Sequence, residues 1–216
     1  MVSERIIDRE WFSRHPVEVA WDLIGCVLRI ERGGVTVAGR IVEVEAYAGP
    51  GDPASHAGRL KVARKAMAGP PGTAYVYLSY GIHTMMNIVS HAEGQSGGIL
   101  LRALEPLEGL DVMHQRRNGV KDAQLARGPG SLGQAMGIHL PDIGTDLMTS
   151  PEFSVHCGRT DKAIHAGPRI GISRAVLAPW RFFEYPSPYV SGHRRGTAVT
   201  RDEVPGLIPP PGTPIE

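Results

Sequence analysis

Short hydrophobic runs separated by glycine and proline dominate the pattern of this chain, and such runs are typical of strands joined by structured loops. The runs 26–32 and 35–47 flank Gly33 and Gly34, and two strands around a glycine pair predict a β-hairpin. Further strands are predicted at 73–80, 82–90, 99–106, 168–173 and 180–185.

The strand predicted over 35–47 carries hydrophobic side chains in both phases of the strand alternation. Ile41 falls in one phase, whereas Val42 and Val44 share the other. Glu45 then lies on the face opposite Val42 and Val44, close to the end of the strand. Because valine is present on both faces, the pattern predicts that this carboxylate is partly buried.

The helices are predicted to be short. Asp8 is a candidate N-cap for a helix in 8–14, and Pro16 suits the first position of a second helix that Gly25 ends. Ser131 is predicted to cap a third helix. Short helices around a mostly antiparallel sheet predict an α+β fold with a protruding hairpin. The helix that Ser131 caps lies within 128–138, and other helical segments are predicted within 60–67 and 107–117.

The length of 216 residues suits one domain, which we place at residues 1–201. The Pro-rich segment 202–216 is predicted to be an extended or frayed C-terminal tail. No stretch approaches the ~18 consecutive apolar residues of a membrane span, and the charged start lacks a signal-peptide core. Two cysteines, Cys26 and Cys157, fit a reducing compartment and are predicted to be buried thiols. We therefore expect an intracellular protein.

Net charge gives no direct indication of a nucleic-acid partner, because 23 Lys and Arg nearly balance 22 Asp and Glu. The charges are nevertheless segregated. Acidic residues are absent from 54–91 and from 163–182, although both windows contain cations. Such segregation can form a basic face on a neutral protein, or the cations can be solvated beside acidic neighbours. The candidate contacts to a DNA backbone are Arg59, Lys61, Arg64 and Lys65.

Tyrosines gather around the first of these windows. Four of the six lie within 34 positions, and Tyr80 with Gly81 forms a predicted turn tip. A tyrosine cluster beside cations suggests base stacking combined with phosphate contact. The four are Tyr47, Tyr75, Tyr77 and Tyr80.

Glu45 is the leading candidate for chemistry, because partial desolvation of a carboxylate can activate it as a general base. Arg102 is equally unusual within the apolar run ILLRALEP. The two could form a functional pair or a purely structural cross-strand ion pair. His56 is either part of a pocket wall or a surface loop residue.

Motifs for metals, nucleotide hydrolysis and thiol chemistry are missing from the sequence. Nine histidines are present without the C-x-x-C, H-E-x-x-H or H-x-E…C-x-x-C patterns of zinc sites. The GPGS segment at 128–131 lacks the Lys-Ser/Thr end of a phosphate-binding loop. We therefore expect no metal site and no nucleotide hydrolysis.

Four blocks of the sequence together resemble the alkyladenine (3-methyladenine) DNA glycosylase family. The resemblance covers roughly residues 5–200, in order and at consistent spacing. Several long blocks in agreement are more specific than any single motif. The blocks are GRIVEVEAYAGPGDPASHAGR at 39–59, GTAYVYLSYGIHTMMNIVS at 72–90, ILLRALEPLEGL at 99–110 and GPGSLGQAMGI at 128–138.

The resemblance implies a role for each matching residue. Glu45 matches the base that activates the attacking water, and Arg102 matches the arginine that helps to hold both. Tyr80 matches the wedge that fills the gap left by a flipped nucleotide. The residues that match the base pocket are Tyr47 on one wall and His56 and Tyr77 on the other. Asn87 matches the residue that excludes guanine by clashing with the exocyclic amino group of that base.

The implied activity is that of a monofunctional base-excision repair glycosylase, because no lysine stands at the position of Glu45 to form a Schiff base. The expected substrate is duplex DNA with a damaged purine, and the expected state is a monomer. The resemblance also implies that the enzyme uses no metal and no cofactor. Such a protein is cytoplasmic and nucleoid-associated in a bacterium and nuclear in a eukaryote. Two alternatives are a non-catalytic nucleic-acid-binding module and a hydrolase of free nucleosides.

Overall fold

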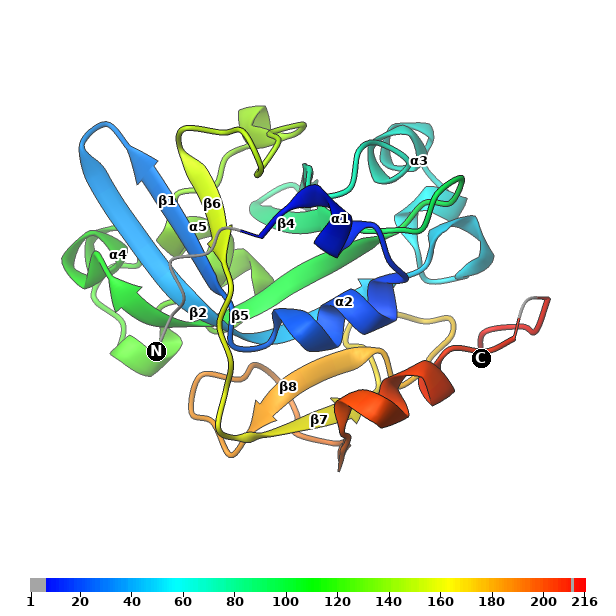
Figure 1. Cartoon of the computed structure of the whole chain (residues 1–216). Helices are drawn as coiled ribbons and strands as arrows, with labels where there is room; N and C mark the ends of the chain where they lie inside the picture. The colour runs from blue at the N-terminus through cyan, green and yellow to red at the C-terminus, as the bar shows by residue number, and fades with distance from the viewer. Residues whose placement is uncertain (1–6, 211) are drawn as a thin grey trace.

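An antiparallel sheet organises the chain, and a computed structural model describes residues 7–210 and 212–216 of it (Figure 1). Within these residues the sheet has nine strands in the order β3-β4-β5-β2-β8-β7-β9, while β1 pairs with β2 and with β6. Every pairing is antiparallel. The strands are β1 Val27–Arg32, β2 Val35–Tyr47, β3 Ala74–Ser79, β4 His83–Val89, β5 Gly98–Glu108, β6 Phe153–His156, β7 Ala163–Gly167, β8 Arg181–Tyr185 and β9 Thr197–Ala198.

The helices are short, as predicted. Asp8 caps the first helix by accepting a hydrogen bond from the Trp11 backbone N–H, and Pro16 opens the second. Ser131 is not a cap, because Gly128 occupies the N-cap position of its helix and Pro129 the first turn. The α-helices are α1 Arg9–Phe12, α2 Pro16–Leu23, α3 Lys61–Met67, α4 Leu110–Arg116 and α5 Pro129–Met136. The 3-10 turns are Gly49–Gly51, His56–Gly58, Asp122–Gln124, Leu140–Asp142 and Arg201–Leu207.

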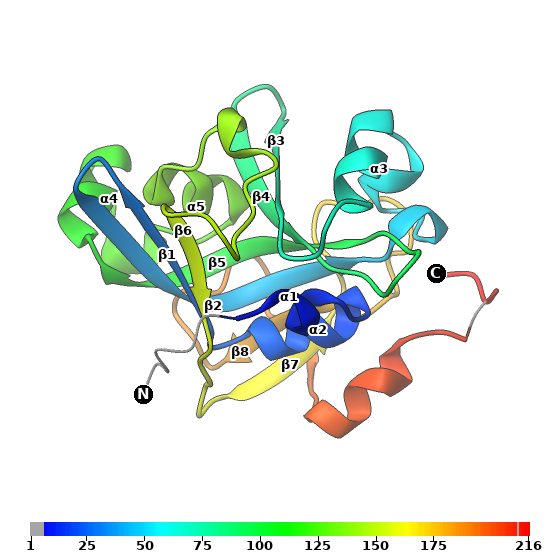
Figure 2. The same ribbon diagram turned by 45° about the horizontal axis from the view of Figure 1, so that its top comes forward.

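The main hydrophobic core joins the helices to the sheet. It packs Leu23 of α2 and Leu132 of α5 against Ile41 of β2 and Leu101 of β5. The predicted α+β fold around a mostly antiparallel sheet is therefore confirmed. The β3–β4 hairpin rises from the sheet and ends free, with α3 standing to one side of it (Figure 2). No helix in the described part of the chain is long and apolar enough to cross a membrane.

One irregularity in the β2–β5 pairing changes the predicted phase of β2. Ile41 pairs with Leu104 and Glu43 pairs with Ala103, so Val42 is an extra residue on β2. Such a bulge shifts the alternation by one position. As a result, Ile41 and Val44 both enter the main core, and Val42 packs in a separate small cluster. The prediction that Val42 and Val44 share a face is wrong for this reason.

The second irregularity places an extra residue on β5. Glu43 pairs with Ala103 but Val44 pairs with Leu101, so Arg102 has no partner on β2. This unpaired position lies directly opposite the two acidic side chains of β2. The bulge therefore allows the Arg102 guanidinium to reach both Glu43 and Glu45.

The strand predicted at 168–173 is wrong, because this segment is a loop between β7 and β8. Its backbone N–H at Ile170 donates to the side chain of Glu45 rather than to a neighbouring strand. Gly171 has φ +78°, which breaks the extended conformation. β6 and β7, for their part, were not predicted.

The segment after residue 200 is folded rather than extended. Residues 201–207 form a 3-10 helix in which Val204 is buried, and the Trp180 indole N–H donates to the Leu207 carbonyl at 2.9 Å. The backbone N–H of Ala178 donates to the Glu216 carbonyl at 2.7 Å. The expectation of an extended tail is wrong over 202–207, and the domain limit at residue 201 stays a prediction.

Candidate active site

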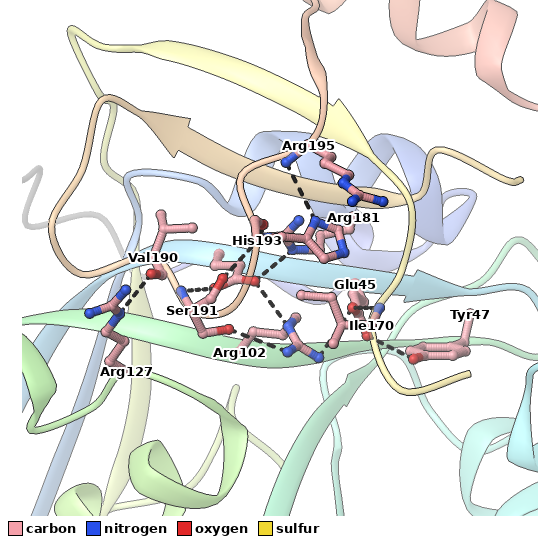
Figure 3. A network of polar contacts seen from close by, with 11 residues as sticks. Glu45, Tyr47, Arg102, Arg127, Ile170, Arg181, Val190, Ser191, His193 and Arg195 are labelled. Atoms are coloured by element: carbon pink, nitrogen blue, oxygen red, sulfur yellow. Dashed lines mark hydrogen bonds and ion pairs between the residues drawn. The ribbon is translucent and has the colours of Figure 1, made fainter. Parts of the chain in front are cut away.

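The Glu45 carboxylate is completely buried and surrounded by donors (Figure 3). Arg102 Nη1 lies 3.1 Å from Oε1, and the Ile170 backbone N–H donates to the same oxygen at 2.7 Å. The Tyr47 hydroxyl donates to Oε2 at 2.8 Å. A buried carboxylate needs such partners, because taking an unpaired charge out of water is costly. Glu45 is thus held in one orientation from three sides.

Arg102 belongs to a larger network of buried charges. Its Nε donates to Glu43 Oε1 at 3.0 Å, and Arg181 Nε donates to the same oxygen at 2.7 Å. The Ser191 backbone N–H donates to Glu43 Oε2 at 2.6 Å. Burial lowers the pKa of Arg102, but Glu45 and Glu43 raise it, and the net direction is upward. Two carboxylates and two guanidiniums therefore balance each other beneath the site.

A cavity of about 530 Å³ opens beside this network. That volume lies within the range of about 300–1,000 Å³ found for small-molecule sites. Every residue predicted for the base pocket lines it, together with Arg102 and Tyr80. Glu45 is not itself on the cavity wall, but the three residues that contact its carboxylate, Tyr47, Arg102 and Ile170, are. The predicted pocket residues on its wall are Tyr47, His56, Tyr77 and Asn87.

Aromatic rings form one side of the cavity. Tyr75 and Tyr77 stack with ring centres 5.5 Å apart, as their shared strand face predicts, and His56 meets Tyr77 edge-on at 4.7 Å. Burial raises the pKa of Tyr77 to about 12 and raises the pKa of Tyr47 well above 10. Burial and then Arg59 lower the pKa of His56. At neutral pH these rings are uncharged and can stack on a planar ligand.

Asn87 is fixed at the wall by its own strand pair. Its amide Nδ2 donates to the Tyr75 carbonyl at 3.3 Å, and the side chain is buried. Because the donor is committed to the backbone, the amide cannot turn freely in the cavity. A fixed polar group at a pocket wall is suited to discriminate between ligands.

Tyr80 stands at the tip of the β3–β4 hairpin and is 89% exposed. Its φ of +51° is unusual for a side-chain-bearing residue, and Gly81 follows it with φ +74°. Leu78 and Ile82 beside it are also exposed. The prediction that Tyr80 and Gly81 form the tip of a turn is therefore confirmed, and the Tyr80 ring is exposed to solvent there.

The predicted cationic residues divide into two groups. Arg59, Lys61, Arg64 and Lys65 are exposed on and before α3, and Arg59 also lines the cavity. The second basic window is divided, because Arg174 is exposed whereas the other two arginines of the window are buried. Arg169 and Arg181 are fully buried in ion pairs, with Asp52 and Glu43 respectively.

Two kinds of comparison relate the chain to known proteins. The family model described as methylpurine-DNA glycosylase matches residues 10–188. A protein from Chlorobaculum parvum is 44% identical over 195 residues, which cover 87% of this chain and 91% of the relative. One from Rhodopseudomonas palustris strain HaA2 is 47% identical over 185 residues, which cover 85% and 89%. Both relatives are named for 3-methyladenine DNA glycosylase activity.

The chain belongs to the methylpurine-DNA glycosylase family. It is a DNA N-glycosylase that acts in the repair of alkylation damage, as the resemblance of its four blocks implies. Its substrate is DNA. Among the residues that the structure describes, no group of three or more His, Cys, Asp or Glu is placed to hold a metal ion.

Several residues of this glycosylase site escaped the sequence interpretation. Glu43 lies two positions before Glu45 on the same strand face, a signal that was available but assigned no role. Arg169 was counted only among the cations of the second basic window, yet its guanidinium lies 4.7 Å from the centre of the Tyr47 ring. Ile170 contacts Glu45 through its backbone N–H, so no side-chain pattern could have identified that contact.

Proposed function

We propose that this glycosylase flips damaged purines out of duplex DNA and hydrolyses their N-glycosidic bonds with a water that Glu45 activates. Its substrates are purines of the 3-methyladenine, 7-methylguanine, hypoxanthine and ethenoadenine class. It acts as a monomer and releases the free base and an abasic site. The observation that carries the proposal is the Glu45–Arg102 pair, which lies directly behind an aromatic-lined cavity.

Base flipping follows from the depth of the site. A base inside a duplex cannot reach a buried carboxylate, and its extrusion costs a few kcal/mol. Stacking on an aromatic side chain is worth about 1–3 kcal/mol per base, so Tyr47 and Tyr77 together can offset that cost. Alkylation at N3 or N7 makes the purine cationic, which strengthens stacking on these rings and improves the leaving group.

The attacking water is assigned to the Oε2 side of Glu45. Oε1 already accepts from Ile170 and lies against Arg102, whereas Oε2 accepts from Tyr47 and has a second lone pair. A water that donates to Oε2 loses its proton to the carboxylate as its oxygen attacks the anomeric carbon. The negative charge of Glu45 also stabilises the positive charge that develops on the sugar.

Water, rather than an amine, is the nucleophile in this proposal. The described residues that line the cavity include no lysine. A Schiff-base route to strand cleavage needs such an amine. The DNA backbone therefore stays intact after excision.

The incubation that tests this function uses duplexes with hypoxanthine, ethenoadenine or alkylated purines, followed by alkaline cleavage of abasic sites. We expect cleavage only after alkali and only at the lesion. Binding without any excision would favour the non-catalytic module instead. Faster release of base from free nucleosides than from duplexes would favour the nucleoside hydrolase.

Replacing Tyr80 with alanine should weaken binding to a lesion duplex more than binding to the same lesion in single-stranded DNA. The exposed ring can fill the gap left by a flipped base only where a stacked duplex surrounds it. The check is a pair of binding isotherms for each DNA form. Leu140→Ala, which also removes an exposed apolar side chain, serves as the control. Equal losses on both DNA forms would remove the wedge role.

Replacing Asn87 with serine should raise the excision of guanine-type purines relative to adenine-type purines. The smaller side chain opens space for an exocyclic amino group at the cavity wall. Competition between the two lesions in one reaction measures the ratio directly. A ratio equal to that of the unaltered protein would contradict the proposed selectivity.

A further inference from the structure

The loop between β8 and β9 packs against both groups that hold Glu45 Oε1. On one side, Arg102 Nη2 donates to Ser191 Oγ at 3.3 Å. On the other side, Gly192 approaches Ile170 so closely that a Cβ would lie 2.7 Å from Ile170 Cδ1. Ile170 also lines the cavity, so the loop adjoins the cavity rim.

Buried groups fix the backbone of this loop from below. The fully buried Arg181 donates through Nη2 to the Ser191 carbonyl at 3.1 Å and to the His193 carbonyl at 2.7 Å. The Ser191 N–H donates to Glu43. Gly192 has φ +59°, which suits glycine and turns the chain outward. The backbone of the loop is therefore held in place from below, and Figure 3 shows His193 and Arg195 beside Arg181.

The side chains that follow are basic and exposed. His193, Arg194 and Arg195 form a run of three. Within the described part of the chain, neither arginine has a carboxylate oxygen within 4.0 Å of its guanidinium nitrogens. Arg194 Nη2 donates to the Ser187 carbonyl at 2.8 Å, which holds one end of its guanidinium at the surface and leaves the other nitrogens as donors. Loss of solvation and the nearby Arg181 lower the pKa of His193, so the charge of the loop comes from the two arginines.

We propose that the loop 192–195 binds a backbone phosphodiester of the DNA next to the flipped nucleotide. This inference rests on the proposed function, because it takes the adjoining cavity as the site of the flipped base; the loop contacts the same backbone phosphate whether or not a base is flipped. Arginine is suited to phosphate, since its planar guanidinium offers paired donors.

The loop also gives phosphate binding a physical connection to chemistry. Ser191 contacts Arg102, and Gly192 contacts Ile170. Both Arg102 and Ile170 hold Glu45 Oε1. A phosphate that holds the loop in place therefore also supports the orientation of the base that activates water.

The test is the salt dependence of binding to undamaged duplex DNA by the Arg194→Ala/Arg195→Ala variant. Each phosphate contact contributes about 0.9 to the slope of log Kobs against log salt. We expect the slope of the double variant to fall in magnitude by about 1–2. A matched variant, Lys121→Ala/Arg159→Ala, removes the same charge at exposed positions elsewhere and should change the slope less.

An unchanged slope, or an equal fall in the matched variant, would overturn the proposal. Arg195→Gln provides a second measurement if the loss of the Arg194 bond to Ser187 impairs folding. Binding to undamaged DNA requires no excision. Failure of the unaltered protein to excise any lesion would therefore count against the proposed function and leave the result for the loop separate.

Discussion

Replacing Glu45 with glutamine should lower the single-turnover rate of base excision by about 10²–10⁴-fold, the usual contribution of a general base. The amide keeps the shape of the side chain. Its oxygen can still accept from Arg102 and Ile170, and its nitrogen can donate to the Tyr47 hydroxyl. Affinity for lesion DNA should therefore be retained while hydrolysis is lost. The measurement is excision from a hypoxanthine duplex at saturating enzyme, together with a binding isotherm.

The control for this substitution is Glu93→Gln, which removes a carboxylate from an exposed position. It should excise at the rate of the unaltered protein. Excision by Glu45→Gln at that same rate would exclude Glu45 as the base. A parallel loss of lesion binding and rate would instead indicate that Glu45 acts by maintaining the cavity.

Replacing Arg169 with methionine should lower the free energy of unfolding by about 3–5 kcal/mol, the usual cost of breaking a buried ion pair. Arg169 Nη2 donates to Asp52 Oδ1 at 2.9 Å, and both side chains are completely buried. The variant leaves the Asp52 carboxylate buried without its cation. Asp52 also accepts from the Ala54 backbone N–H, so the cavity-side loop should loosen with it. Chemical denaturation measures the loss.

A second substitution separates the charge from the packing. In Arg169→Met/Asp52→Asn, no unpaired charge is buried, and asparagine can still accept from Ala54. This double variant should recover part of the lost stability. A single variant within about 1 kcal/mol of the unaltered protein, the net worth of an ordinary hydrogen bond, would show that the pair contributes little. A double variant no more stable than the single one would show that packing, rather than charge, accounts for the loss.

Arg169 also connects stability to the site. Its guanidinium lies over the Tyr47 ring at 4.7 Å and near the Trp180 ring at 5.1 Å from the ring centres. Tyr47 in turn lines the cavity and donates to Glu45. The buried pair thus supports one wall of the pocket from behind, at a distance that no local sequence pattern encodes.

Glu45 was predicted to be the carboxylate with a chemical role because it lies near the end of an apolar strand. In the structure it lies near the end of β2, and its side chain is buried. The extent of burial was underestimated, because the pattern of β2 alone does not include the loop 168–173 that covers it. The sequence left two interpretations of Glu45 and Arg102 open, a purely structural ion pair and a functional pair. Both interpretations describe the same contact between Arg102 Nη1 and Glu45 Oε1. The roles of the two residues in catalysis stay predictions.

The sequence by itself determined the family, through four blocks that agree in order and spacing. It also determined local elements of this protein: the first hairpin, the exposed turn at Tyr80 and Gly81, and the short helices, of which Asp8 caps the first. These depend on side-chain alternation and turn residues within a few positions of each other. Tertiary structure decided the bulges at Val42 and Arg102, the loop 168–173 and the buried partners of Arg169 and Arg181. These features depend on pairing between segments more than 50 residues apart, where desolvation and charge compensation outweigh local preference.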